Sequence, residues 1–266
     1  MEPKPKKSLG QNFLADEQVA KDLTEAAEIK KSDTVLEVGA GTGVLTKFLA
    51  QKAKKVIAVE IDPDLIHHLK KNLENLSNVE IVNTDILTLD ISEFSPSKIV
   101  GSIPYQITSP LIHKILHSQD RPKSITFVVQ KEVAEKICAK SPKATYLSVF
   151  VENFGKAQII RTIKPSAFTP PPKVDSAILH IDLFAKPKIE DTYKVEKLLH
   201  HGFRQQRKMI KHRFPAEVLK DSQIPPHQRP ANLTKEDWHR IYRTIGATRE
   251  KRKTRRGGGV WIDIFG

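Results

Sequence analysis

Short apolar runs alternate with longer segments of helical periodicity as far as about residue 184 of the 266-residue chain. Runs of about five apolar residues are typical of buried parallel strands, and repeats every three to four positions are typical of amphipathic helices. This alternation predicts an α/β fold with a doubly wound, Rossmann-like sheet. The predicted strands are 34–38, 56–60, 79–82, 99–102, 124–129, 157–163 and 177–183, and the predicted helices are 44–53, 63–73 and 110–117.

The pattern changes after residue 184, where charged helical segments replace the strands. Further helices are predicted over 192–200, 204–214 and 235–245, with proline-containing stretches between them. We therefore expect an α/β domain over residues 1–184 and a small all-helical C-terminal domain over residues 185–247. Residues 248–266 contain a cluster of basic residues followed by three glycines, and we expect them to form a flexible basic tail.

Composition and charge narrow the possible functions. The chain is 39% hydrophobic and 28% charged, which excludes disorder of the whole chain. Its net charge is +13, and residues 181–266 contribute 20 basic against 10 acidic residues, as expected for a protein that binds a polyanion. Cys138 is the single cysteine, which excludes an internal disulfide and a four-cysteine zinc site. The chain has no apolar leader and no apolar stretch of membrane-spanning length, so we expect a cytoplasmic protein without membrane association.

A glycine-rich turn follows the first predicted strand. The strand ends in Glu37-Val38, and Gly39-Ala40-Gly41-Thr42-Gly43 then leads into the helix 44–53. Glycine suits positions where φ is positive or where a ligand contacts the main chain. Glu60 ends the next strand nineteen residues after Gly41, a spacing at which a carboxylate binds ribose hydroxyls. The pattern therefore predicts a nucleoside cofactor.

Two features favour S-adenosyl-L-methionine over a dinucleotide. Position 44 is Val, where the dinucleotide fingerprint has a third small residue, and the Glu37 carboxylate would repel a pyrophosphate at the helix N-terminus. A cationic aminosulfonium group is compatible with that carboxylate. Asp85 follows the third strand at the same sheet edge and is a candidate acceptor for the adenine amine, although taken alone it would be interpreted as a turn or cap residue.

The fourth strand leads into Ser102-Ile103-Pro104-Tyr105. The exocyclic amine of a base is a poor nucleophile because its lone pair is delocalised into the ring. The hydroxyl of Ser102 and the carbonyl of Ile103 could both accept hydrogen bonds from such an amine and favour a pyramidal nitrogen. Pro104 stiffens the turn, and Tyr105 offers a face on which a base can stack. This tetrapeptide therefore predicts a site that methylates a base amine.

A second aromatic residue precedes a proline-rich loop. The segment Phe168-Thr169-Pro170-Pro171-Pro172-Lys173-Val174-Asp175-Ser176 leads into the last predicted strand. The rigid loop would hold Phe168 as a second stacking surface for the base. Taken alone, the segment is equally consistent with a polyproline linker and a core phenylalanine.

Together these motifs resemble the rRNA adenine N6,N6-dimethyltransferase family over about residues 5–245. The N-terminal Leu9-Gly10-Gln11-Asn12-Phe13-Leu14 is similar to the family's opening motif, and Ser102 to Tyr105 is similar to its catalytic tetrapeptide. The family usually has Asn where this chain has Ser102, so a shorter acceptor stands there. The resemblance implies cofactor contacts from a set of residues at these motifs, namely Gln11, Asn12, Leu14, Glu37, Gly39, Gly41, Glu60, Ile61, Asp85, Ile86 and Ser102. It implies a reaction site made of Ser102, Ile103, Pro104, Tyr105 and Phe168.

The stretch from Phe203 to Lys211 resembles the basic helix of the family members that act on small-subunit rRNA. Its cations are Arg204, Arg207, Lys208 and Lys211, which would lie on one face of a helix and suit the phosphates of structured RNA. A solvated charged face is the alternative interpretation.

The resemblance implies dimethylation of two adjacent adenines near the 3′ end of small-subunit (16S) rRNA, in an assembling small subunit. No metal is expected, and we expect a monomer. A non-catalytic ribosome-assembly or nucleic-acid-binding factor with the same fold is one alternative, and a large-subunit (23S) rRNA adenine methylase of the macrolide-resistance type is another. A nucleotide-dependent oxidoreductase is a more distant alternative.

Overall fold

The computed structural model describes residues 5–253 and divides the chain into two compact units. Unit 1 comprises the residues up to 135 together with 156–185, and unit 2 comprises residues 136–155 together with the residues from 186 onward. The first unit ends close to the predicted boundary at 184. Residues 136–155, which we expected in the α/β domain, instead belong to unit 2.

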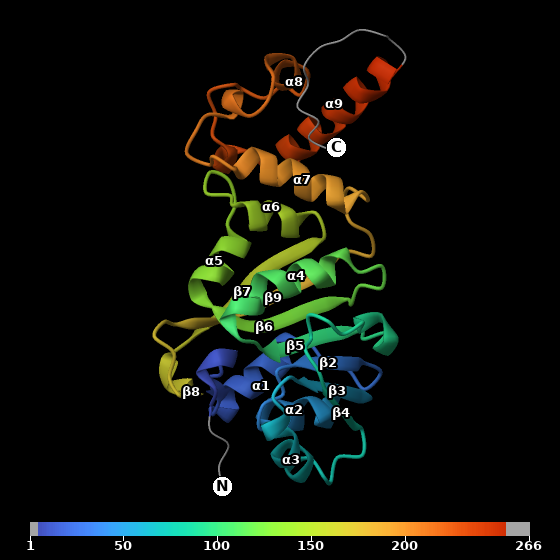
Figure 1. Cartoon of the computed structure of the whole chain (residues 1–266), viewed down its shortest axis with the longest axis vertical. Helices are drawn as coiled ribbons and strands as arrows, with labels where there is room; N and C mark the ends of the chain where they lie inside the picture. Colours follow the sequence, from blue (N-terminus) through green and yellow to red (C-terminus); the bar gives the residue numbers. More distant parts are fainter. Residues whose placement is uncertain (1–4, 254–266) are drawn as a thin grey trace. The chain divides into compact units, whose positions relative to one another are not determined.

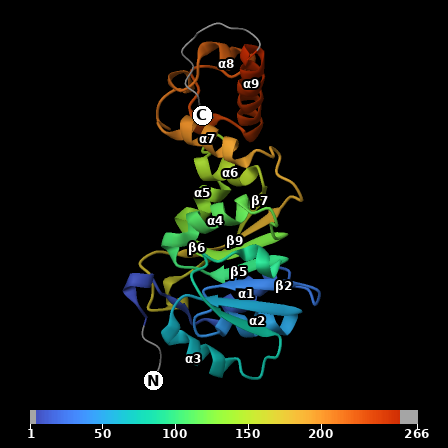
Figure 2. The same cartoon turned by 45° about the vertical axis from the view of Figure 1, so that its right-hand side comes forward.

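A seven-stranded sheet in the order β4-β3-β2-β5-β6-β9-β7 forms the centre of unit 1 (Figure 1). The pairings from β4 to β6 are parallel, and β9 pairs with β6 in the antiparallel direction. Figure 2 shows the strands β2, β5, β6, β9 and β7 of this sheet from a second direction. The strands are β2 (Thr34–Val38), β3 (Lys55–Glu60), β4 (Val79–Asn83), β5 (Lys98–Ser102), β6 (Ser124–Gln130), β7 (Gly155–Ile163) and β9 (Ser176–Leu183). All seven predicted strands are present, with ends that differ by at most two residues.

The helices α1 and α2 pack on one face of this sheet, where apolar side chains from six of its strands form a continuous core. The core includes Val35 of β2, Val56 of β3 and Val100 of β5, all of which are fully buried. Its stability comes from removing these side chains from water. The helices of unit 1 are α1 (Glu17–Ala26), α2 (Val44–Lys52), α3 (Pro63–Asn72) and α4 (Thr108–His117), and α5 (Lys131–Cys138) runs from unit 1 into unit 2.

A second, two-stranded sheet joins the N-terminal segment to the proline-rich loop. In it β1 (Phe13–Leu14) pairs with β8 (Phe168–Thr169) in the antiparallel direction, with Leu14 opposite Phe168. The amides of Ala15 and Asp16 donate to the carbonyl of Ala167, which continues the connection. Segments about 150 residues apart in the chain are therefore held side by side.

Unit 2 is helical in the part of the chain that the structure describes. Trp238 lies in the core of this unit: it is 1% exposed and stacks on Phe203, with ring centroids 5.2 Å apart. Gly202 is required below this indole, because a Cβ there would lie 2.3 Å from a Trp238 ring carbon. The helices are α6 (Tyr146–Glu152), α7 (Thr192–Phe203), α8 (Ala216–Asp221) and α9 (Lys235–Lys253).

Two predictions for this C-terminal region are wrong in part. The predicted helix 204–214 does not form: α7 ends at Phe203, residues 204–207 form turns, and a short 3-10 helix, η5, covers Ile210–His212. A tertiary contact interrupts the helical pattern here: the Ile210 amide donates to the carbonyl of Gln228 at 2.6 Å, and the preceding Met209 has an extended backbone. The predicted tail is helical as far as Lys253, and its remainder lies outside the described residues.

Candidate active site

The glycine-rich turn between β2 and α2 has the backbone conformation that the sequence predicted. Gly39, Gly41 and Gly43 have φ values of 72°, 57° and 87°. A Cβ on Gly39 would lie 3.2 Å from the carbonyl oxygen of Ser102, so the end of β2 passes close to the end of β5. This turn therefore requires glycine both for its φ angles and for its contact with the next strand.

Glu60 ends β3 and is 5% exposed. Its Oε2 accepts a hydrogen bond from the Gly41 amide at 2.8 Å, and its Oε1 accepts one from the Asp62 amide at 2.9 Å. Burial raises the pKa of Glu60, and these two amide donors limit the increase. The carboxylate is thereby fixed at the mouth of the glycine turn, in the position expected for a ribose-binding acid.

Glu37 has a different environment from the one the sequence predicted. Its side chain is fully buried under the sheet face that α1 and α2 cover, and it is absent from the wall of the cavity described below. Neither carboxylate oxygen has a hydrogen-bond partner among the described residues, and the nearby Thr46 hydroxyl lies outside hydrogen-bond geometry. Burial raises the pKa of Glu37 to about 8, and the charge of Glu60 adds to the increase. Glu37 is therefore mostly protonated at neutral pH.

The N-terminal segment is fastened to the end of β3 through Asp62. This carboxylate is 1% exposed and accepts hydrogen bonds from Lys6 Nζ at 2.6 Å and from Gln11 Nε2 at 2.9 Å. It also caps α3 through the Asp64 amide. Burial alone would raise the pKa of Asp62, but the Lys6 and Gln11 donors lower it below its ordinary value. The cap of one helix therefore anchors the opening motif of the chain.

The tetrapeptide at the end of β5 faces the glycine turn. Ile103 is buried, Ser102, Pro104 and Tyr105 are half-buried, and a short 3-10 helix, η3 (Tyr105–Ile107), follows. The Tyr105 hydroxyl lies 2.7 Å from the Ser176 hydroxyl. Burial raises the pKa of Tyr105, so its phenol is neutral at physiological pH.

Phe168 is placed beside these residues by the β1–β8 pairing. It is only 4% exposed, so the structure buries most of its ring where the sequence predicted an exposed stacking surface. Phe168 nevertheless contributes to the wall of the same cavity as Tyr105.

The cavity lies at the carboxyl ends of β2 and β5, where the chain leaves the sheet in opposite directions. Ligands of doubly wound sheets bind at this switch point. Its volume is about 160 Å³. Every predicted cofactor and reaction residue except Glu37 contributes to its wall: Gln11, Asn12, Leu14, Gly39, Gly41, Glu60, Ile61, Asp85, Ile86, Ser102, Ile103, Pro104, Tyr105 and Phe168.

Sequence reasoning missed several residues at or behind this wall. Phe13, Thr42, Gln106 and Ile107 contribute to the cavity, and Ser176 lies behind Tyr105. Phe13, Thr42 and Ser176 lie inside motifs that the sequence analysis quoted, so position within a motif was an available signal. Nothing in the sequence pointed to Gln106 or Ile107, because their place depends on the fold of η3.

The predicted RNA-binding cations lie in unit 2, on turns and not on one face of a helix. Arg204 follows the end of α7, Arg207 is in a turn, Lys208 is in the bend that follows, and Lys211 is in η5. All four side chains are exposed, and none has a carboxylate partner within residues 5–253. They remain available to an anionic partner.

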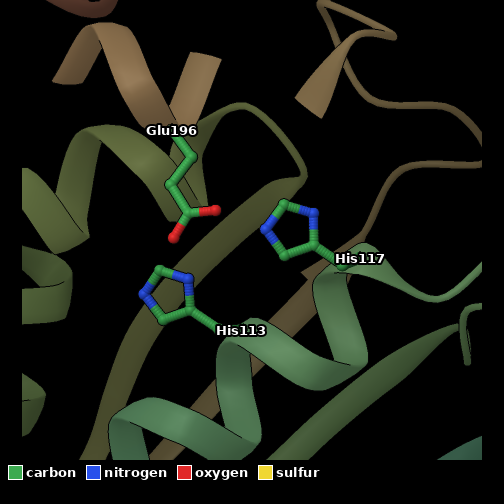
Figure 3. A group of neighbouring side chains, drawn as sticks. All are labelled: His113, His117 and Glu196. Carbon is green, nitrogen blue, oxygen red and sulfur yellow. The ribbon is translucent and has the colours of Figure 1, made fainter. Parts of the chain in front are cut away.

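Two histidines that the sequence analysis did not single out lie on α4. The rings of His113 and His117 have centroids 6.3 Å apart, and Figure 3 shows both projecting from the same side of the helix. Glu196, also drawn there, belongs to α7 of unit 2. Neither histidine contributes to the cavity, and the expectation that no metal is needed remains a prediction.

The fold and the cavity define a Rossmann-like methyltransferase, with a glycine turn and the buried carboxylate of Glu60 at the switch point. The sequence model of the ribosomal RNA adenine dimethylase family matches residues 3–246. The chain belongs to this family.

Known proteins similar to this chain include rRNA methyltransferases of two substrate classes. Ribosomal RNA small subunit methyltransferase A of Clostridium botulinum (strain Kyoto / Type A2) is 41% identical over 189 residues, which cover 69% of each chain. The crystal structure of a dimethyladenosine transferase from Plasmodium falciparum has a TM-score of 0.78 and 28% identity, covering 88% of this chain and 98% of that one. The crystal structure of the 23S rRNA methyltransferase ErmE has a TM-score of 0.73 and 29% identity, covering 88% of this chain and 100% of that one. In the part of the chain that the structure describes, no helix has the length and apolarity needed to cross a membrane.

Proposed function

We propose that this protein transfers methyl groups from S-adenosylmethionine to the N6 amines of two adjacent adenines, in a hairpin loop near the 3′ end of small-subunit rRNA. We place this reaction in the assembling small subunit. The observation that carries the proposal is one cavity whose wall contains both the cofactor motifs and the Ser102–Tyr105 turn. The identity with small-subunit methyltransferase A supports the choice of the small subunit over the large one.

The donors and acceptors at the cavity fit S-adenosylmethionine. The glycine turn exposes backbone without side chains, and Glu60 presents a fixed carboxylate for ribose hydroxyls. Asp85 uses Oδ1 to accept from the Leu87 amide at 2.8 Å, while within the described residues its Oδ2 has no partner and could accept from the adenine amine. We assign these three groups to the cofactor, together with Gln11, Asn12, Leu14, Ile61 and Ile86. When bound, S-adenosylmethionine supplies an electrophilic methyl group.

Residues of the tetrapeptide bind and orient the target amine. The Ser102 hydroxyl and the Ile103 carbonyl accept its two N–H groups, which favours a pyramidal nitrogen with its lone pair free. Tyr105 stacks on the extruded base, which stabilises it by about 1–3 kcal/mol. The chain contributes proximity and orientation, and the surplus proton leaves to water. The exposed cations Arg204, Arg207, Lys208 and Lys211 bind RNA phosphates.

The test uses undermethylated small subunits and S-adenosylmethionine with a labelled methyl group. Wild-type protein is expected to label the rRNA, and mass spectrometry of the digested rRNA then gives the position and the number of methyl groups. Glu60→Ala and Tyr105→Ala are expected to lower the rate at least tenfold while RNA binding is retained.

Other outcomes would favour the alternatives. RNA binding by wild type without labelling would contradict the proposal and support a non-catalytic assembly factor. Labelling of large-subunit rRNA instead would support a methylase of the ErmE type.

A further inference from the structure

We infer that Ser176 is a positioning residue that holds the ring of Tyr105 in the orientation needed to stack on the target base. The inference rests on the proposed function, because it gives Tyr105 a stacking role. Its physical basis is the hydrogen bond between the two hydroxyl groups, which are 2.7 Å apart.

The two partners differ in how firmly the fold holds them. Tyr105 begins η3, a 3-10 helix of three residues without a side-chain cap, and is half-buried at the cavity wall. Ser176 begins β9 and is completely buried. It lies opposite Gln130 of β6 in the sheet register. The hydrogen bond therefore ties a side chain on a short turn to the rigid central sheet.

This attachment restricts the ring of Tyr105. An aromatic ring on a short turn is free to change its χ1 and χ2 angles unless contacts hold both ends of the side chain. The backbone of η3 holds one end, and the hydroxyl bond to Ser176 holds the other. An O–H···O distance of 2.7 Å is typical of a well-formed bond. The bond thus fixes the ring in the cavity wall before the base arrives.

Ser176 has no other described hydrogen bond through its side chain. A serine hydroxyl buried in a strand has an energetic cost unless it has a partner, and Tyr105 is that partner. The fold contains a matched contrast in Ser124, which begins β6, is 4% exposed, and has a hydroxyl without a partner in the described residues. Ser124→Ala therefore removes a buried strand hydroxyl without touching the site.

The test is a double-mutant cycle on single-turnover methylation of small subunits. Tyr105→Phe and Ser176→Ala are each expected to lower the rate about threefold to tenfold, which corresponds to one hydrogen bond. The double variant is expected to match either single variant, because both remove the same bond. Ser176→Thr keeps the hydroxyl and is expected to restore most of the rate, and Ser124→Ala is expected to match wild type. The KM for S-adenosylmethionine is expected to stay constant in all variants.

A second measurement, by ¹⁹F NMR, reports on the environment of the Tyr105 ring directly. The chain has four tyrosines, so 3-fluorotyrosine labelling gives a ¹⁹F spectrum that the Tyr105→Phe variant assigns. Ser176→Ala is expected to shift or broaden the Tyr105 resonance, and Ser124→Ala is expected to leave it unchanged.

The two measurements separate failure of this inference from failure of the proposed function. An unchanged Tyr105 resonance in Ser176→Ala, or rate losses that multiply in the double variant, would overturn the inference. Absence of methylation by wild type would overturn the proposed function, and the ¹⁹F spectrum would still decide whether Ser176 holds the ring.

Discussion

Replacing Glu37 by Gln should change the way in which the stability of the protein depends on pH. The native state keeps a proton on Glu37 up to about pH 8, whereas an unfolded chain releases it near the ordinary carboxyl pKa of 4.5. Between these values the native state binds more protons than the unfolded state, so the free energy of unfolding falls as pH rises. The stabilisation is complete below pH 4.5 and is lost by about pH 8.

The magnitude follows from the proton difference. When the native state binds one more proton than the unfolded state, the free energy of unfolding falls by about 1.4 kcal/mol per pH unit. Raising the pH from about 5.5 to about 7.5 should therefore lower it by about 2 to 3 kcal/mol through this residue. Glutamine has nearly the same shape and no charge, so Glu37→Gln lacks this contribution. Other ionisable groups, Glu60 among them, are common to both proteins, and the difference between wild type and variant removes most of their effect.

The assay is urea unfolding of the two proteins at several pH values, followed by far-ultraviolet circular dichroism. Tryptophan fluorescence is unsuitable, because Trp238 belongs to unit 2 and Trp261 also follows residue 185. Glu37→Gln is expected to gain stability relative to wild type as pH rises. A wild-type minus variant difference that stays constant from about pH 5.5 to about pH 7.5 would refute a neutral, buried Glu37.

Three further predictions concern the site and the basic turns. Gly39→Ala should lower the affinity for S-adenosylmethionine at least tenfold in calorimetry, because the new Cβ meets the Ser102 carbonyl at 3.2 Å and the φ of 72° is strained for alanine; unchanged affinity would contradict this. Asp62→Asn keeps the α3 cap but weakens the bond from Lys6, and trypsin should cleave after Lys6 about tenfold faster, as measured by mass spectrometry. Arg207→Ala should reduce the slope of log affinity for RNA against log salt by about one, as expected for the loss of one phosphate contact. An unaltered slope would show that Arg207 does not contact the RNA.

The sheet could be predicted from the sequence because buried parallel strands consist of short continuous runs of apolar residues. Helix α6 could not be predicted from the sequence, because the segment Tyr146–Glu152 is apolar and resembles a strand. It is helical because Thr145 and Ser148 form a capping box, and because its aromatic side chains pack in unit 2. The absence of a helix over 204–214 has the opposite cause: a helical pattern is overridden by the hydrogen bond from Ile210 to Gln228.

Most residues of the candidate site could be predicted because they follow strands in short motifs. Glu37 was misplaced because the alternation of a strand turns its side chain toward α2, away from the cavity wall. Ser176 was quoted only as part of a motif because its partner, Tyr105, is 71 residues away in the sequence. Contacts of this kind depend on the completed fold and leave no local pattern.

The pairing of β1 with β8 sets the order in which the site can be assembled during synthesis. One wall of the cavity leaves the ribosome well before its partner strand, which is translated about 150 residues later. A nascent chain that ends before residue 168 therefore lacks Phe168 and Thr169, and S-adenosylmethionine cannot yet stabilise it through a closed pocket. Until that point the growing α/β sheet has to remain folded, or protected by chaperones, without help from its ligand.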